Sequence, residues 1–279
     1  PASPAAPLPL PEAMPLDPQA APTELVPVAR ATLRRATMTD PDPGHEFADV
    51  TLQLFGQRTV PAPPVPLNNG FVGSYAGRPG DDGRPVGAAG GRTIMQCLDP
   101  NLVPVLSALA SNFVVCDRWF ASVPGPTWPN RLFVHAATSG GLADSPIPAQ
   151  VLASQVPGGG FAMPTIYESL MDHGRTWKIY FDDQAQAFAL RNLHRHLDRF
   201  QRFETFAADV AAGTLADYSF IEPQYFSALG NPATDQHPPH RLEDGERLIA
   251  AVYDTLRSNE AVWRRALLVV LYDEHGGIY

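Results

Sequence analysis

One hydroxyl and two adjacent acids stand out because each follows a run of apolar residues. Thr127 lies in PGPTWPNR, after the run NFVVCDRWFASV, while Asp273 and Glu274 directly follow ALLVVLY. A threonine hydroxyl is a weak nucleophile until a base or a metal ion activates it. Carboxylates are hard oxygen ligands that suit Mg²⁺, Ca²⁺ or Mn²⁺ better than Zn²⁺. These residues therefore predict a hydroxyl activated by a divalent metal ion.

The position of Thr127 leaves two interpretations open. Pro129 favours a helix that begins near Thr127, because proline is well tolerated in a first helical turn. The free N–H groups at such an end stabilise an anion such as phosphate, which suits a catalytic role. A threonine there can equally be a simple helix cap.

The two acids need a break in the chain to act together. Adjacent residues of a strand point to opposite faces, so Asp273 and Glu274 can reach one ion only if the strand ends there. The sequence HGG at 275–277 supplies the required backbone freedom. Two carboxylates are too few to hold such an ion, so we expect further ligands from elsewhere.

Two histidines are separated by two prolines, which restrict how the two rings can lie relative to each other. In DQHPPH, a polyproline turn of three residues would put His237 and His240 on one side. Holding a phosphate or donating a proton suits this pair better than binding zinc. His45, in DPDPGHEF, lies at or just before a predicted helix start, where it can also be an ordinary loop residue.

Three further acids follow predicted strands. Asp182 and Asp183 come after WKIYF, and Glu222 comes after YSFI. Each alone is explained by ordinary solvation of a loop. Ligands of open parallel sheets bind at the carboxyl ends of the strands, so convergence at one edge favours a functional role.

The elements that must position these residues alternate along the chain. Near-continuous apolar strands belong in a parallel sheet with helices on both faces. We therefore predict a doubly wound α/β/α sandwich. The predicted helices span 45–56, 101–112, 164–174, 203–213 and 244–259, and the predicted strands span 113–120, 177–181, 218–223 and 265–274.

Composition excludes some classes of protein. The 279 residues carry 20 Lys and Arg against 29 Asp and Glu, without a basic stripe, so no nucleic-acid partner is expected. No apolar run reaches the roughly 20 residues of a membrane span, and no basic amphipathic helix is apparent, so membrane contact is expected to be transient at most. Nine of the first 27 residues are Pro, which predicts an extended or disordered arm over 1–39 and a catalytic domain over 40–279.

Six motifs together resemble the phosphoesterase family of non-specific phospholipases C and acid phosphatases, from about Asp40 to Tyr279. They are CDRWFASVPGPTWPNRLFVHAATS, DPDPGHEF, NNGFV, YSFIEPQYF, DQHPPH and VVLYDEHGGIY. The resemblance implies an alkaline-phosphatase-like three-layer α/β/α core and a metal-dependent hydrolysis of phosphate esters through a phospho-threonine intermediate.

Matching the motifs assigns roles to individual residues. Thr127 takes the place of the nucleophile and joins Asp273 and Glu274 at the metal, while His237 and His45 take positions that contact the phosphoryl group. Weaker substrate-binding candidates are Asn130, Asp182, Asp183, Glu222 and His240. The implied substrate is a phospholipid or a small phosphate ester.

One departure from the family pattern affects the expected activity. Relatives carry a Glu-Asn pair near the N-terminus that binds the metal, and this sequence contains no Glu-Asn dipeptide. We therefore expect a catalytic domain truncated at both ends, weak or inactive alone, from a parent that is an enzyme. A phospholipase C acting on glycerophospholipids is the leading interpretation, with a phosphomonoesterase or a non-catalytic remnant as alternatives. Composition suggests a bacterial protein, and either an exported or a cytoplasmic location is compatible.

Overall fold

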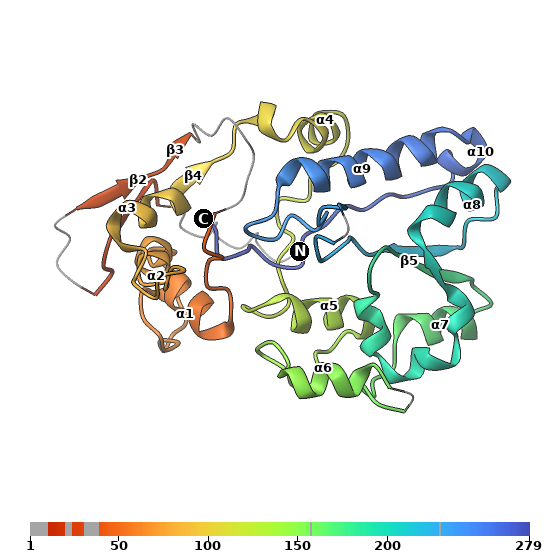
Figure 1. Ribbon diagram of the computed structural model, residues 1–279, viewed down its shortest axis with the longest axis horizontal. Helices are drawn as coiled ribbons and strands as arrows, with labels where there is room; N and C mark the ends of the chain where they lie inside the picture. The colour runs from red at the N-terminus through yellow and green to blue at the C-terminus, as the bar shows by residue number, and fades with distance from the viewer. Residues whose placement is uncertain (1–10, 20–23, 31–38, 157, 229) are drawn as a thin grey trace, which may run out of the picture.

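The computed structural model describes residues 11–19, 24–30, 39–156, 158–228 and 230–279. Its elements group into two parts (Figure 1). One part contains the short strands β1 to β4 and the helices α1 to α3, and the other contains a parallel sheet with its helices, against one of which, α9, helix α4 packs. The C-terminal segment returns from the second part to the first. The two parts are therefore held together by segments that are distant in sequence.

The first part has two pairs of short strands. Strands β1 and β2 are antiparallel, β3 and β4 are parallel, and Met14 and Val26 pack with Phe71 and Ile94 in a buried cluster. The element bounds are β1 Ala13–Pro15, β2 Leu25–Pro27, β3 Ala29–Arg30, α1 Phe47–Phe55, α2 Phe71–Ala76, α3 Gly87–Gly91, η1 Arg92–Met95, β4 Gln96–Cys97, η2 Pro100–Leu102 and α4 Pro104–Asn112.

Strands β1, β2 and β3 lie within the arm predicted for residues 1–39. Where the arm is described, it contributes Met14 and Val26 to a core. Residues 1–10, 20–23 and 31–38 of that arm lie outside the described residues. The division into an arm and a catalytic domain therefore stays a prediction.

The second part is built on a sheet with the strand order β6-β5-β7, in which both pairs are parallel. The element bounds are α5 Thr127–Ala136, α6 Pro148–Ser154, α7 Ile166–Asp172, β5 Trp177–Phe181, η3 Gln186–Ala189, η4 Arg191–Arg195, η5 Leu197–Arg199, β6 Phe200–Arg202, η6 Phe203–Thr205, α8 Phe206–Ala212, β7 Tyr218–Ile221, α9 Leu242–Arg257 and α10 Glu260–Trp263.

Helices cover this small sheet on both faces. Trp177 and Ile179 of β5 pack in one cluster with Tyr167 of α7, whereas Tyr180 packs in another with Phe206 of α8 and Val252 of α9. The alternation follows from the two-residue period of a strand, which sends successive side chains to opposite faces. The predicted α/β class, with parallel strands and helices around them, is therefore confirmed at this coarse level.

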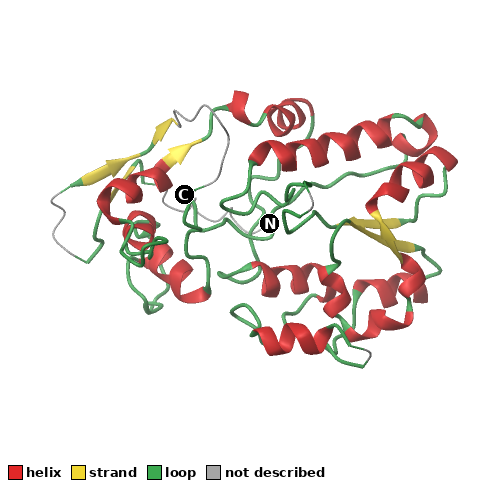
Figure 2. Cartoon of the chain, in the orientation of Figure 1, coloured by secondary structure: helices red, strands yellow, loops and turns green. Residues whose placement is uncertain are grey.

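Two of the four predicted strands are absent from the structure. Residues 113–120 and 265–274 are drawn as loop (Figure 2), and neither run pairs with a strand within the described ranges. Val114 and Leu267 are each 88% exposed. The prediction failed because a strand exists only when a neighbour accepts its hydrogen bonds, and apolar composition cannot show whether that neighbour is present.

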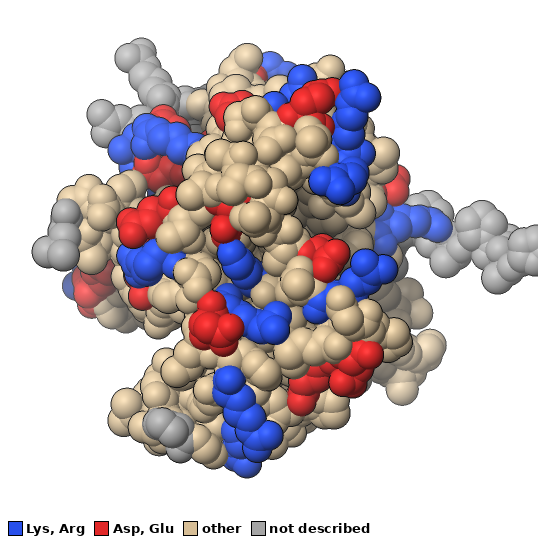
Figure 3. Space-filling view, turned by 90° about the vertical axis from the view of Figure 1, so that its right-hand side faces the viewer, with Lys and Arg blue, Asp and Glu red and all other residues tan. Residues whose placement is uncertain are grey.

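No helix in the described parts of the chain is long and apolar enough to cross a membrane. Charged side chains of both signs are mixed over the end of the molecule that carries α8 and α10 (Figure 3). That face therefore presents no extended field of a single sign.

A buried ion pair fastens α5 to the end of β7. Arg131 Nη2 lies 2.5 Å from Glu222 Oε2, and the Tyr225 hydroxyl donates to the same oxygen at 2.5 Å. The other carboxylate oxygen accepts from the backbone N–H of Ala187 at 2.9 Å. Glu222 is fully buried, so its charge depends on these partners.

We expect Glu222→Gln to lower the free energy of unfolding by about 3 kcal/mol, because it leaves the Arg131 charge buried without its counter-ion. Glu260→Gln is the matched control, since Glu260 pairs with Arg264 on an exposed surface and should cost less than about 1 kcal/mol. Urea unfolding of both variants measures the difference. Equal, small losses would show that the buried pair does not hold α5 in place.

Candidate active site

Thr127 occupies the first residue of α5, as its sequence context predicted. The N-cap is Pro126, and no side chain makes a capping hydrogen bond at this end. The alternative that Thr127 merely caps the helix is therefore wrong. Its side chain instead lies near enough to the Asp273 carboxylate to lower the pKa of that group. The hydroxyl and one predicted metal ligand are thus neighbours at a helix N-terminus.

Asn130 fixes the loop that leads into Thr127. Its side-chain Nδ2 donates to the carbonyl oxygens of Val123, Gly125 and Pro126 at 3.0–3.1 Å, and its Oδ1 accepts from the N–H of Val123 at 2.8 Å. The amide is buried and fully engaged by the backbone. Asn130 therefore orients the loop that precedes Thr127, and the substrate contact predicted for it stays a prediction.

The chain turns sharply after Asp273, as two acids acting together require. Glu274 Oε2 accepts from the N–H of Gly276 at 2.7 Å and lies 3.1 Å from His275 Nδ1. Gly276 and Gly277 have φ values of 65° and 67°, in the left-handed region that glycine adopts without strain. The HGG sequence therefore supplies the turn that holds the Glu274 carboxylate.

The two carboxyl groups differ in their electrostatic surroundings. Burial raises the pKa of Asp273 above its ordinary value, although the charge of Arg131 and the side chain of Thr127 oppose this rise. Burial also pushes the pKa of Glu274 upward, but the bond from His275 and the charge of His45 outweigh it, and the pKa lies below its ordinary value. The net effect disfavours the ionised form of Asp273 and favours the ionised form of Glu274.

A second loop packs directly against this turn. A Cβ built on Gly277 would lie 2.5 Å from the carbonyl oxygen of Gly44, so the two backbones approach closely. Gln53 of α1 donates to the same Gly44 oxygen at 2.7 Å and contacts His275 Nε2 through its Oε1 at 2.9 Å. This contact brings His45 close to Glu274, although more than two hundred residues separate them in the sequence.

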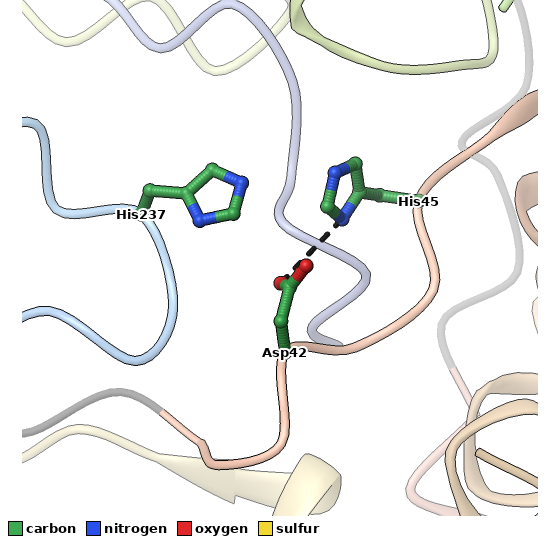
Figure 4. A group of neighbouring side chains, drawn as sticks. All are labelled: Asp42, His45 and His237. Atoms are coloured by element: carbon green, nitrogen blue, oxygen red, sulfur yellow. Dashed lines mark ion pairs between the residues drawn. The ribbon is translucent and has the colours of Figure 1, made fainter. Parts of the chain in front are cut away.

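Asp42, His45 and His237 form a cluster (Figure 4). Glu274 is close enough to interact electrostatically with Asp42 and His45. Asp42 Oδ1 lies 3.6 Å from His45 Nδ1, and the centroids of the two imidazole rings are 5.1 Å apart. One ligand atom from each of the three residues lies within 4.8 Å of the others. The cluster could therefore hold a metal ion, and burial raises the pKa of Asp42 above its ordinary value.

In both His45 and His237, the ring nitrogen Nδ1 contacts a backbone carbonyl oxygen. His45 Nδ1 lies 2.8 Å from the carbonyl oxygen of Pro43, and His237 Nδ1 lies 2.6 Å from that of Pro238. A carbonyl oxygen can only accept, so each Nδ1 carries a hydrogen. Nε2 is then the nitrogen left on each ring to bind a ligand or exchange a proton.

His240 lies near this cluster, on the same side as His237. Its Nδ1 is 2.7 Å from Asp235 Oδ1, and its ring centroid is 6.3 Å from that of His237. The same Asp235 oxygen accepts from the N–H of His237 at 3.1 Å. The N–H of His240 also donates to the carbonyl oxygen of His237 at 2.7 Å, so this segment is a hydrogen-bonded turn and not the predicted polyproline turn.

The remaining acids take part in other contacts. Asp183 Oδ2 accepts from the N–H groups of Tyr225 and Phe226 at 2.8–2.9 Å, and Glu222 is engaged by Arg131. Burial raises the pKa of Asp182, which also lies in the field of Arg202. The structure records no contact of these acids with Thr127, and their substrate-binding role stays a prediction.

Two residues of this region were missed in the sequence. Asp42 lies three residues before His45 in DPDPGH, and that spacing was the only signal for it. Arg131 lies one helical turn after Thr127, in PTWPNR, and its charge acts on Asp273. An arginine on a helix reads as an ordinary surface residue until its burial is known.

The site offers two sets of ligands for a metal ion. The oxygen atoms of Thr127, Asp273 and Glu274 suit a hard divalent cation, whereas the mixed nitrogen and oxygen set of Asp42, His45 and His237 also suits transition metals. The buried Oδ1 of Asp42 accepts no hydrogen bond. The donor chemistry therefore fits a metal cofactor without deciding its identity.

We expect Gly277→Ala to separate the two loops and to destabilise the protein more than Gly276→Ala. Both substitutions place alanine at a positive φ, but the new Cβ meets Gly44 O at 2.5 Å in the first and only Pro238 Cδ at 3.6 Å in the second. The backbone strain costs about 1–2 kcal/mol in each, and the clash adds about 2 kcal/mol to Gly277→Ala alone. Urea unfolding measures both; equal losses would contradict the close contact of the loops.

Comparison with known proteins gives consistent matches. The chain is 38% identical over 247 residues to non-specific phospholipase C6 of Arabidopsis thaliana, covering 88% of this chain and 44% of that protein. It is 36% identical over 245 residues to non-specific phospholipase C3 of the same plant, covering 86% and 44% respectively. Phospholipase C B of Mycobacterium tuberculosis (strain CDC 1551 / Oshkosh) is 30% identical over 205 residues, covering 63% and 36%.

The chain spans less than half the length of these curated relatives. A model of the phosphoesterase family matches residues 13–279, which include the Thr127 loop, the acidic turn and the histidine cluster. The chain belongs to the phosphoesterase family.

Proposed function

We propose that the protein containing this chain is a metal-dependent hydrolase of phosphate esters, and specifically a phospholipase C that acts on glycerophospholipids. The observation that carries the proposal is the position of Thr127 at the N-terminus of α5, with its side chain beside the Asp273 carboxylate. Family membership and the names of the relatives support phosphoester chemistry. The phospholipid substrate is carried over from those names.

In the proposed reaction, Thr127 Oγ1 attacks phosphorus and forms an oxygen–phosphorus bond. Its proton passes to the neighbouring Asp273 carboxylate, while the bond from phosphorus to the diacylglycerol oxygen breaks. His237 donates a proton to that oxygen from Nε2, and His45 binds a phosphoryl oxygen. Water then cleaves the phospho-threonine, which releases the phosphorylated head group and restores Thr127.

The N-terminus of α5 and a bound cation stabilise the negative charge in this step. The free N–H groups at the start of α5 favour the negative charge of a phosphoryl group. We assign the cation to Thr127, Asp273 and Glu274, with the remaining ligands outside this set. A divalent ion bound there supplies Lewis acidity, which lowers the hydroxyl pKa and offsets charge on the phosphoryl oxygens. His240, Asn130, Asp182, Asp183 and Glu222 remain candidates for binding the rest of the substrate.

For the fold, we propose the alkaline-phosphatase-like three-layer α/β/α sandwich. The parallel order β6-β5-β7 and the helices on both of its faces support this assignment. The positions of Thr127 and Asp273, each after an apolar run of the sequence, also support this assignment.

We expect Thr127→Val in the complete gene product to reduce hydrolysis of p-nitrophenylphosphorylcholine by more than about 10³-fold, because valine has the shape of threonine without its hydroxyl. Thr127→Ser is the matched control and should retain measurable turnover and a trapped phosphoserine in mass spectrometry. Undiminished hydrolysis by the valine variant would overturn the proposal. Faster turnover of p-nitrophenyl phosphate than of the choline diester would instead assign a phosphomonoesterase.

Removal of metal should abolish turnover reversibly. After chelation, we expect Mg²⁺, Ca²⁺ or Mn²⁺ to restore hydrolysis better than Zn²⁺, since the proposed ligands are all oxygen atoms. The Asp273→Asn variant should require more metal for half-maximal activity, whereas Asp82→Asn, at a carboxylate that is 65% exposed, should not. Restoration by Zn²⁺ alone would favour the Asp42, His45 and His237 set.

A further inference from the structure

Three buried polar atoms of α5 and η3 have no hydrogen-bond partner among the described residues. They are Nε of Arg131, Nε2 of His135 and Oε1 of Gln186. A buried donor or acceptor that stays unpaired loses its hydration without compensation, so native proteins leave few of them. Three in neighbouring side chains therefore indicate that something else binds to them.

All three side chains line the same small cavity. Arg131 and His135 are four residues apart and so lie on one face of α5, and Gln186 is the first residue of η3. The rest of the lining consists of Trp128, Leu132 and Ala187. The cavity has a volume of about 10 Å³, which matches the space that one buried water molecule needs.

His135 presents a donor at its unpartnered nitrogen. Burial lowers the pKa of His135 to about 3, and the charge of Arg131 adds to this effect, so the ring is neutral. Its Nδ1 lies 2.9 Å from the Tyr167 hydroxyl, which has no other hydrogen-bond partner in the described part of the chain. Because a buried phenol needs an acceptor for its hydrogen, Tyr167 donates to Nδ1. The ring hydrogen of His135 therefore sits on Nε2.

The occupant of the cavity must both accept and donate hydrogen bonds. Nε of Arg131 and Nε2 of His135 are donors, whereas Oε1 of Gln186 only accepts. A monatomic anion would accept from the two donors but would leave the amide oxygen unpaired. A cation could bind the amide oxygen but could not accept, and the Arg131 charge would repel it. Water does both and has the size of the cavity.

We propose that this cavity binds one structural water molecule, which accepts from Arg131 Nε–H and His135 Nε2–H and donates to Gln186 Oε1. Arg131 already binds Glu222 through Nη2, so the water holds its guanidinium at a second point. The charge of Arg131 acts on Asp273, and the water thereby positions that charge. The proposal goes beyond the proposed function and does not depend on any step of the proposed reaction.

A high-resolution crystal structure of the complete gene product tests the site directly. We expect one electron-density peak within hydrogen-bond distance of Arg131 Nε, His135 Nε2 and Gln186 Oε1. Crystals soaked in bromide should show no anomalous signal at that position. A bromide peak would assign an anion site instead, and a cavity without density would be dry. Either result would overturn the proposal.

A matched pair of substitutions tests what the water contributes. Gln186→Met removes the acceptor of the water, and Gln184→Met is the control, since Gln184 is exposed two residues away. We expect the density peak to disappear in Gln186→Met alone. That variant should also lower the melting temperature of the complete gene product by at least about 2 °C, against less than about 1 °C for the control.

The Arg131 side chain supplies a readout of its own. We expect its Nε–H, observed by NMR, to exchange with solvent at least about tenfold faster in Gln186→Met than in Gln184→Met, because the water no longer holds the guanidinium. Equal exchange rates in the two variants would show that the cavity does not position Arg131, which would contradict the proposal.

Discussion

The site depends on the close approach of two loops, where the backbone of Gly277 lies against the carbonyl oxygen of Gly44. A larger residue at 277 would force the loops apart, which explains why glycine stands there. Gln53 reinforces the contact by bonding to Gly44 on one side and His275 on the other. Because of this contact, the histidine of one loop influences the ionisation of Glu274 in the other. The ionisation of Glu274 therefore depends on a steric constraint, the close approach of the two backbones.

The helices and two of the strands were predictable because their signals are local. Gly56 ends α1 in the left-handed conformation, Thr165 and Glu168 form a capping box at the start of α7, and β5 has the predicted bounds Trp177–Phe181. The runs 113–120 and 265–274 carry equally strong strand composition but have no ladder partner in the described ranges. A strand is a property of a pair of segments, and one segment cannot reveal its partner.

The candidate site was predictable to a similar extent. Thr127 and Asp273 each follow an apolar run, and two prolines separate His237 from His240, so neighbouring residues constrain where these side chains lie. The structure brings Thr127 and Asp273 together. Asp42 and Arg131 could not be identified, since their importance depends on burial and on residues far away in the chain. Asn130 and Glu222 were noticed for their residue types, but their contacts recorded here are with the protein itself.

The carbonyl contacts of His45 and His237 have a consequence for how protons move through the centre. A ring held this way cannot shuttle a proton between its two nitrogens without giving up its backbone anchor. Each imidazole therefore has only Nε2 free of the backbone, and the two rings lie edge to face with their centroids 5.1 Å apart. A ligand held between the rings would meet one nitrogen from each, so the two carbonyl contacts set the direction from which it is bound.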